Sequence, residues 1–185
     1  ISCRNYESIK IVIMEPTSMY AQIYIAIQKR IAALVPEIKW IDLDVGQLEN
    51  YGERPAVQFP CVLIDFPGAT YSNLSQGVQL WDGNISTRLG FDPFSNTNHL
   101  TPDAVKFKGL EYLEIEQKLY AALSGFTADD NMQPLVRISD ATEGRDDKFR
   151  VRQTLFTSAA EDETAMLPQN ITEALLLIDP EIITT

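Results

Sequence analysis

The stretch from residue 55 to residue 91 most constrains the fold, because two apolar segments typical of strands lie there on either side of a polar interval. Residues 61–66, CVLIDF, are almost continuously apolar, as expected of a strand that is covered on at least one face. Pro60 and Pro67 flank this run. Because proline cannot donate a hydrogen bond to a neighbouring strand, we expect the strand to end at both prolines and the stretch to form the centre of a β-sheet.

The second apolar segment changes parity at Gly83. Val78 and Leu80 begin an alternation of apolar and polar residues. Beyond Asp82-Gly83-Asn84 it continues in the opposite parity, through Ile85, Thr87, Leu89 and Phe91. Either Asp82-Gly83 forms a tight hairpin turn, or Gly83 marks a bulge that lets one long strand keep its apolar face inward. We favour the bulge, and therefore one strand over residues 79–91 that follows a polar loop at 67–77.

An amphipathic helix is predicted at about residues 18–35. Its apolar residues recur at spacings of three and four, at Tyr20, Ile23, Ile27, Ile31 and Leu34, and Tyr24 and Val35 join them. Thr17 or Ser18 can cap the first turn, because a hydroxyl there accepts a hydrogen bond from a free backbone N–H group. Pro36 ends the helix, since the residue before a proline disfavours helical backbone angles.

A second helix is predicted from Thr101-Pro102-Asp103, or from residues 106–109, to about Ser124. Its apolar face is formed by Tyr112, Ile115, Leu119 and Leu123. Gly125 can adopt the left-handed conformation that ends a helix, and Phe126 can fold back as the apolar residue of a Schellman cap. Residues 92–103, before this helix, are rich in Pro, Ser, Thr, Asn and Asp and predict an exposed loop.

Three further strands complete the predicted sheet. One is expected at about residues 38–44, before a polar connection at 45–54. An antiparallel hairpin is expected at 135–141 and 148–158, around a charged turn. The order of elements predicts an α+β fold, with a mostly antiparallel sheet of four to five strands and two amphipathic helices packed on one face. It fits neither a doubly wound nucleotide-binding fold nor an all-β sandwich.

The 185 residues are enough for one domain with a sizeable core, which we expect at residues 14–160. Residues 1–13 are expected to be an N-terminal extension, native or not, since Met14 is a plausible start. Residues 161–185 are expected to form a C-terminal arm, which contains the aliphatic run Leu175-Leu176-Leu177-Ile178. Four consecutive large aliphatic side chains are unfavourable in water, so we expect this run to dock on its own domain or on a neighbouring subunit.

The composition argues against several classes of function. The formal net charge is −11 and the isoelectric point is about 4.5, so a general surface for polyanions is not expected. The sequence contains no run of about 18 apolar residues, so no membrane span is predicted. Cys3 and Cys61 lie far apart and fit neither a disulfide framework nor the spacing of a zinc site, which favours a reducing compartment.

No arrangement of residues typical of a catalytic site is visible, so we expect no enzyme and no catalytic, cofactor-binding or metal-binding residues. His99 is the only histidine, and it lacks a partner nearby in the sequence for a triad or a metal site. A small-ligand pocket near Trp81 and His99 is the alternative to a binding or structural role.

Two acidic segments contain side chains that could bind a cation. Asp82-Gly83-Asn84 and residues 143–147, EGRDD, contain carboxylates, but neither has the ligand spacing of a calcium loop. Turn chemistry is the favoured reason for both segments. Gly77, Gly83 and Gly90 are spaced too widely for a phosphate-binding loop.

The pattern of elements resembles the tail terminator, or tail completion, proteins of long-tailed bacteriophages and prophages. The matching pieces are the opening helix, the Pro-bounded strand, the long second strand, the end of the second helix and the late hairpin, at residues 19–35, 55–64, 79–91, 121–125 and 150–157. The resemblance covers about residues 18–158. It lies in this pattern and not in any invariant motif.

The resemblance implies a viral structural protein that forms a closed homo-oligomeric ring, typically a hexamer, at the head-proximal end of the tail tube. Such a ring terminates the tail and joins it to the head, so its partners are copies of itself, the tail tube protein and the head-tail connector protein. It needs no cofactor and no membrane. The implied location is the tail or neck of the virion, after assembly in the host bacterial cytoplasm.

The same resemblance gives the acidic balance of the chain a second interpretation. DNA would pass through the ring without specific binding, because a negatively charged channel lining would repel it. The predicted loops at 67–77 and 92–105 would be candidates for contacts along the stack of rings. Another head-tail neck or connector protein of similar size is the alternative.

Overall fold

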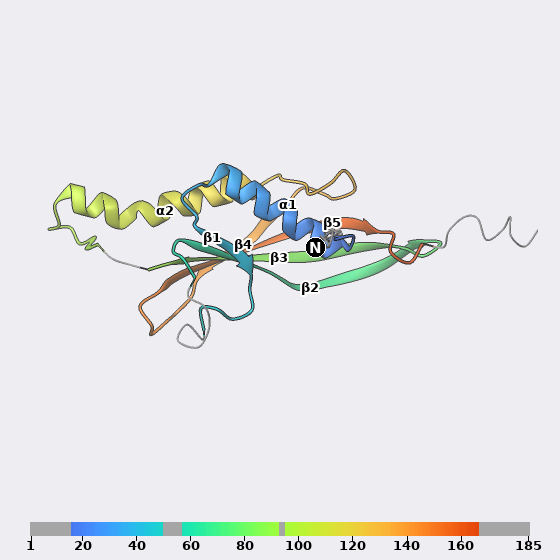
Figure 1. The fold of residues 1–185 in the computed structure, drawn as a ribbon, viewed down its shortest axis with the longest axis horizontal. Coiled ribbons are helices and arrows are strands. Elements are labelled where there is room, and N and C mark those ends of the chain that lie inside the picture. Colours follow the sequence, from blue (N-terminus) through green and yellow to red (C-terminus); the bar gives the residue numbers. More distant parts are fainter. Residues whose placement is uncertain (1–15, 50–56, 93–94, 167–185) are drawn as a thin grey trace, which may run out of the picture.

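The computed structural model describes residues 16–49, 57–92 and 95–166, in which two helices and five strands form an α+β fold (Figure 1). The elements are α1 (Met19–Leu34), β1 (Trp40–Leu43), β2 (Cys61–Ser75), β3 (Val78–Phe91), α2 (Asp103–Leu123), β4 (Val136–Thr142) and β5 (Arg150–Asp162). The strands lie in the order β1-β2-β3-β5-β4, and only the β1–β2 pair is parallel. The predicted fold class is confirmed, and both helices lie on one face of the sheet (Figure 1).

Helix α1 begins and ends close to the predicted residues. Ser18 is the N-cap, and its side chain accepts a hydrogen bond from the backbone N–H of Ala21 at 3.4 Å. Ile23, Ile27 and Ile31 are buried against the sheet. The prediction for Leu34 was wrong, because this side chain is 47% exposed, whereas Val35, also predicted on the apolar face, is buried at the end of the helix.

Helix α2 begins at Asp103, the earlier of the two predicted starts, and buries Ile115, Leu119, Ala122 and Leu123. Gly125 has a φ of 75°, as its left-handed position requires. Phe126 packs against the core as expected, but the predicted Schellman cap is not formed, because the N–H of Gly125 donates to the carbonyl of Leu135 at 2.9 Å. The end of the helix is thereby tied to the chain that leads into β4.

The bulge predicted at Gly83 is not formed, and a bulge that was not predicted lies in β2. The register between β2 and β3 shifts between Asp65 and Gly68, whereas β3 pairs with β5 without a shift from Gln79 to Phe91. Before the shift Val62 and Ile64 face the helices, and after it Ala69 packs against the same core. Pro67 therefore does not end the strand, because the ladder is already interrupted where its missing N–H would bond.

Residues 67–77 were predicted to be a loop, and this was wrong. They form the distal part of a long hairpin, in which β2 and β3 pair from Gly68 and Asn84 to Ser75 and Val78. The turn lies at Gln76 and Gly77, which have φ values of 48° and 89°. Neither face of this hairpin is fully buried, so its sequence is polar and contains Ser and Thr. It therefore lacks the apolar alternation by which a strand is predicted. By contrast, residues 95–102 form no helix or strand, as predicted for that part of the loop.

Trp81 explains why the apolar pattern of β3 was misread. Trp81 is fully buried on the helix-covered face together with Ile85, Leu89 and Phe91, whereas Leu80 lies on the other face. The indole ring of Trp81 lies over Gly83, so a side chain there would overlap its Cε2 and Cζ2 atoms. Gly83 is therefore neither a bulge nor a turn, and it provides space for a large ring.

A second, smaller core lies on the face of the sheet without helices. It consists of Leu48, Val57, Cys61, Leu63 and Val151, with Trp40, Phe59 and Phe149 packed around it. The rings of Phe59 and Phe149 stack with their centroids 4.9 Å apart. This core attaches the segments around residue 48 and residue 149 to one end of the sheet.

We expect Cys61→Ser to lower the free energy of unfolding by about 1 kcal/mol, because a hydroxyl would be desolvated in place of a thiol that behaves as a small apolar group. Cys61 is fully buried, and burial raises the pKa of its thiol to about 11. Urea denaturation of both proteins measures the difference. An unchanged midpoint would show that the pocket around Cys61 accommodates a polar group.

Candidate functional site

The structure does not bring Trp81 and His99 together. Trp81 lies in the part of β3 close to the hairpin turn, and its indole N–H donates to the hydroxyl of Tyr20 at 3.0 Å. His99 is exposed in the segment that leads into α2, at the opposite end of the sheet (Figure 1). The proposed ligand pocket between them is therefore not formed.

The two acidic segments have different structures. Asp82-Gly83-Asn84 lies inside β3, so the predicted turn there was wrong. Residues 143–147 do connect β4 to β5, and Glu143 and Asp147 accept hydrogen bonds from arginines. Among the residues that the structure describes, no group of three or more His, Cys, Asp or Glu side chains could hold a metal ion.

An arginine cluster lies on the face without helices, at the end of the sheet where the second core packs. Arg88 of β3 donates to Asp44 at 2.7 Å, to Glu143 at 2.6 Å and to Glu49. Arg145 donates to Asp147 and to Glu143 at 3.2 Å. Two guanidinium groups thus hold four carboxylates, so the cluster has a formal charge of −2.

The cluster shifts the acidity of its members. Hydrogen bonds from Arg88 hold the pKa of Glu49 and of Glu143 below the usual range, and Arg145 does the same for the pKa of Asp147. The side chain of Arg88 is only 12% exposed, and its hydrogen bonds to carboxylates raise its pKa further. Arg88 was not predicted as a site residue from the sequence. The signal was a lone arginine between Thr87 and Leu89 in an otherwise uncharged run.

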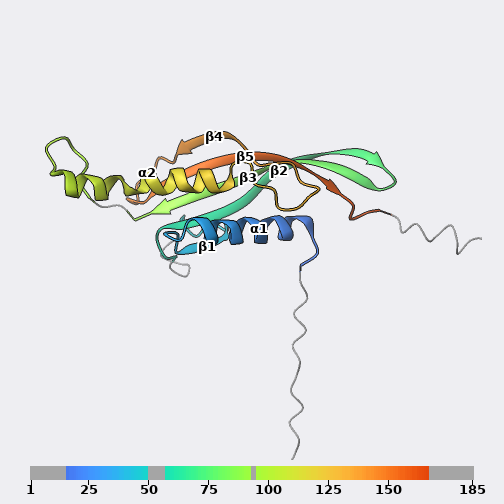
Figure 2. The same ribbon diagram turned by 90° about the horizontal axis from the view of Figure 1, so that it is seen from above.

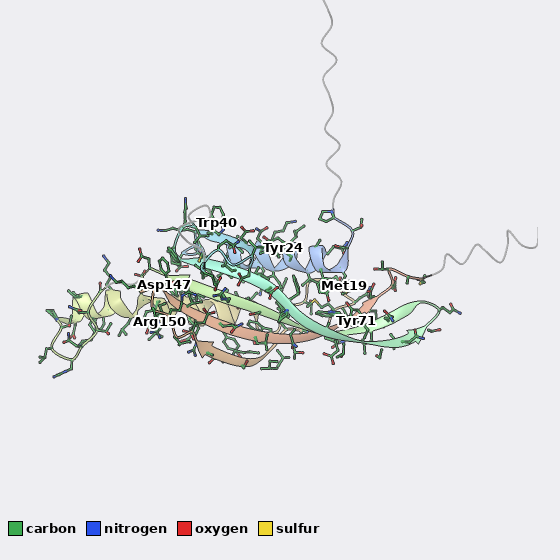
Figure 3. All side chains as sticks on the ribbon, turned by 90° about the horizontal axis from the view of Figure 1, so that it is seen from below. Met19, Tyr24, Trp40, Tyr71, Asp147 and Arg150 are labelled. Atoms are coloured by element: carbon green, nitrogen blue, oxygen red, sulfur yellow. The ribbon has the colours of Figure 1, made fainter. Side chains whose placement is uncertain are left out.

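The same sheet face is open and acidic beyond the cluster. Asp65, Asp82 and Glu161 are exposed there on β2, β3 and β5, and they make no ion pair within the described part of the chain. Their neighbours on this face are mainly small and polar, including Asn84, Ser86, Gln153 and Thr157. Figure 3 shows this face, with the strands in front of the helices. The face therefore presents carboxylates without nearby basic partners.

The hairpin of β2 and β3 extends beyond the first turn of α1 (Figures 1 and 2). Its base is fixed on the helix side, where the hydroxyl of Tyr71 lies 3.1 Å from that of Tyr20. Towards the tip the side chains are exposed, and Leu74 is 50% exposed. We call this the hairpin end of the molecule. It presents apolar side chains that the other described residues cover only about half.

The opposite end is formed by the first turns of α2 and the segment before it, which project beyond the sheet (Figures 1 and 2). Leu100 is 81% exposed and Phe107 is 65% exposed. A cavity of about 690 Å³ lies beside them, between α2 and the adjoining ends of β3 and β5. We call this the cavity end. The molecule thus has two distant ends with exposed apolar side chains, a shape suited to contacts between copies.

Comparisons with known proteins add little to these surfaces. No protein-family model matches the chain, and a search of curated proteins finds no match. Among solved structures, the chain is similar to one from "Virion of native gene transfer agent (GTA) particle". The TM-score is 0.45 and the sequence identity is 10%, over 76% of this chain and 95% of that chain. In the described residues no helix is long and apolar enough to cross a membrane.

Proposed function

We propose that this chain is a structural protein of a phage or phage-like particle, and that it forms the tail terminator ring. In this role it acts as a homo-oligomer, typically a hexamer, at the head-proximal end of the tail tube. Its partners are the tail tube protein and the head-tail connector protein. It has no enzymatic role, and DNA passes through the ring without specific binding.

The hairpin end is the observation on which this proposal mainly depends. The hairpin projects past α1 with Tyr71 and Leu74 exposed, so these side chains contribute little to the stability of a monomer. They can be buried against a neighbouring copy. The hairpin end and the cavity end differ, so a contact between them is head-to-tail. Repeated by rotation, a head-to-tail contact closes into a ring.

The open acidic face supports the same role. If Asp65, Asp82 and Glu161 face the channel of the ring, their charges repel the phosphates of passing DNA. The arginine cluster adds a net negative charge on the same face, because its arginines are already paired with carboxylates. A lining of this kind lets DNA slide through without adhering.

We expect the full-length protein to form a ring-sized species, with Leu74→Lys reducing its mass towards that of a monomer. A charged tip would have to be desolvated in the contact between copies, which opposes assembly. Light scattering over a range of concentrations measures the mass, in the absence and presence of tail tubes from the same phage. Electron microscopy shows whether the large species is a ring on the tube.

Leu34→Lys is the matched control, since Leu34 is similarly exposed, at 47%, but lies at the end of α1 away from the hairpin. It should leave both the mass and the melting temperature nearly unchanged. A monomer at every concentration that also fails to bind tail tubes would contradict the proposal. Binding to isolated connectors but not to tubes would instead assign the chain to the neck.

A further inference from the structure

The cavity beside α2 has an apolar floor and a rim that includes three cations. Phe91 and Ile115 are buried in its floor, and the ring of Tyr112 lies edge-on to Phe91 with the centroids 5.8 Å apart. Lys39, Lys108 and Arg150 line the rim, and none of them forms an ion pair within the described residues. The guanidinium group of Arg150 lies 4.2 Å from the centroid of Tyr112. We call this cavity the Lys108 cavity.

Three cations that form no ion pair within the described residues thus lie together on this rim. The rim also contains Glu37, Asp92 and Glu111, but Glu37 is occupied by Lys118. The rim is therefore slightly positive on a molecule whose formal net charge is −11. An occupant that suits it has a large aliphatic portion for the floor and carboxylates for the rim.

One segment of the chain itself has this chemistry. Residues 167–185, which lie outside the described residues, contain LLLI at 175–178. Their only charged side chains are Glu173, Asp179 and Glu181, which flank that run on both sides. The aliphatic run matches the floor, and the flanking carboxylates match the rim.

The length of this segment decides between its own cavity and that of a neighbour. The chain leaves the described region at Met166, beside the hairpin turn, where Gly77 packs against the backbone of Ala165. The Lys108 cavity lies at the other end of the sheet, and Figure 3 shows Arg150 and Tyr71 at these opposite ends. Along β3, from Gly77 at the turn to Phe91, the separation is about 46 Å at about 3.3 Å a residue.

A segment that starts at Met166 falls short of its own cavity. Even fully extended, it reaches only about 43 Å by Ile178, the last residue of the run, at most about 3.6 Å for each residue. A route around the surface of the molecule would be longer still. A neighbouring copy, whose hairpin end faces this cavity end, can place the run there without such extension.

We infer that the Lys108 cavity receives residues 175–178 of a neighbouring copy, with Lys39 and Lys108 facing the acidic side chains that flank the run. This inference rests on the proposed ring and names the contact that links its subunits. The C-terminal segment then fastens the hairpin end of one subunit to the cavity end of the next. The contact is head-to-tail, as ring closure requires.

A charge exchange between two full-length variants tests this contact. The acceptor variant carries Lys39→Glu and Lys108→Glu, and the segment variant carries Asp179→Lys and Glu181→Lys. Lys39 and Lys108 are exposed on the cavity rim, so we expect the acceptor variant to fold. The other two substitutions lie in the C-terminal segment, outside both cores. We expect each variant alone to associate about tenfold more weakly in light scattering, and an equimolar mixture to recover the mass of the wild-type species.

Recovery on mixing requires that the segment of one chain meets the cavity of another. If mixing restores nothing while all four substitutions in one chain do, the segment docks on its own subunit and the inference is wrong. The control is Lys29→Glu with Lys148→Glu, which changes the charge equally at two lysines that lie outside this cavity and form no ion pair with any described residue. It should not weaken association.

A second measurement separates this inference from the proposed ring. A fluorescent peptide of residues 167–185 should bind the wild-type full-length chain in fluorescence anisotropy, and the acceptor variant should bind it about tenfold more weakly. A ring that forms normally in both charge variants, with no binding of the peptide, overturns the inference and leaves the ring standing. Binding of the peptide by a chain that forms no ring supports the contact and counts against the tail terminator.

Discussion

Replacing Arg88 by methionine is expected to lower the free energy of unfolding by about 3 kcal/mol at pH 7, because carboxylates close to the sheet lose their common partner. The side chains of Asp44 and Glu143 are only 11% and 22% exposed, so water replaces the guanidinium group poorly. The methionine fills much of the same volume. The loss therefore reports on unpaired charge rather than on a cavity.

The difference in stability between the wild type and Arg88→Met should also depend on pH, in a direction that follows from the pKa shifts. In the wild-type protein the pKa values of Glu49 and Glu143 are lowered by Arg88, so their contribution to stability is present above the ordinary glutamate pKa of about 4.3. It is lost as the pH falls through their folded values. In Arg88→Met these carboxylates repel one another, and protonation relieves the repulsion. The difference between the two proteins should therefore shrink as the pH falls from about 5 to about 3.

Urea denaturation at a series of pH values between 3 and 7 measures this difference. Lys106→Met is the control, since Lys106 pairs at 3.1 Å with Asp103, which is 75% exposed, and such a pair contributes at most about 1 kcal/mol. Arg88→Lys should lie between the wild type and Arg88→Met, because an ammonium group keeps the charge but cannot form the forked hydrogen bonds. A stability difference that stays constant over this pH range would contradict the proposed role of the cluster.

The arginine cluster also shows which parts of the site the sequence could not predict. Helix faces and strand alternation depend on neighbours along the chain, so both helices and the β4–β5 hairpin were predicted close to their observed places. The cluster joins Asp44, Arg88 and Glu143, which are far apart in the sequence and meet only because β3 pairs with β2 and β5. A single sequence contains no local signal for such a meeting.

The hairpin end was missed for a different reason. Its apolar residues are sparse, because much of it is exposed on both faces, and Pro67 indicated a strand end. The bulge at this proline lets the strand continue, whereas the parity of the sequence had predicted a bulge at Gly83, where β3 is regular. The parity of β3 was misread because of Trp81. Its burial depends on a hydrogen bond to the hydroxyl of Tyr20 and on the space above Gly83, and neither is visible in the sequence.

Gly83→Ala is expected to lower the free energy of unfolding by about 2–3 kcal/mol, although it adds a single methyl group to a strand. That methyl group would overlap the indole of Trp81 and would lie 2.7 Å from its Nε1 atom. The ring cannot move aside easily, because it is fully buried and its N–H donates to Tyr20 at 3.0 Å. Overpacking of this kind typically costs about 1–3 kcal/mol.

Gly68→Ala provides the matched control in the adjacent strand, at the residue that pairs with Asn84. No heavy atom lies within 4 Å of a Cβ atom built there, so we expect a change of at most about 1 kcal/mol, in either direction. The partner of the clash is identified by a double-mutant cycle with Trp81→Phe. In that background the smaller ring leaves room for the methyl group, and Gly83→Ala should cost less than half as much. Additive losses in the cycle, measured by urea denaturation, would show that the cost of the methyl group does not arise from Trp81.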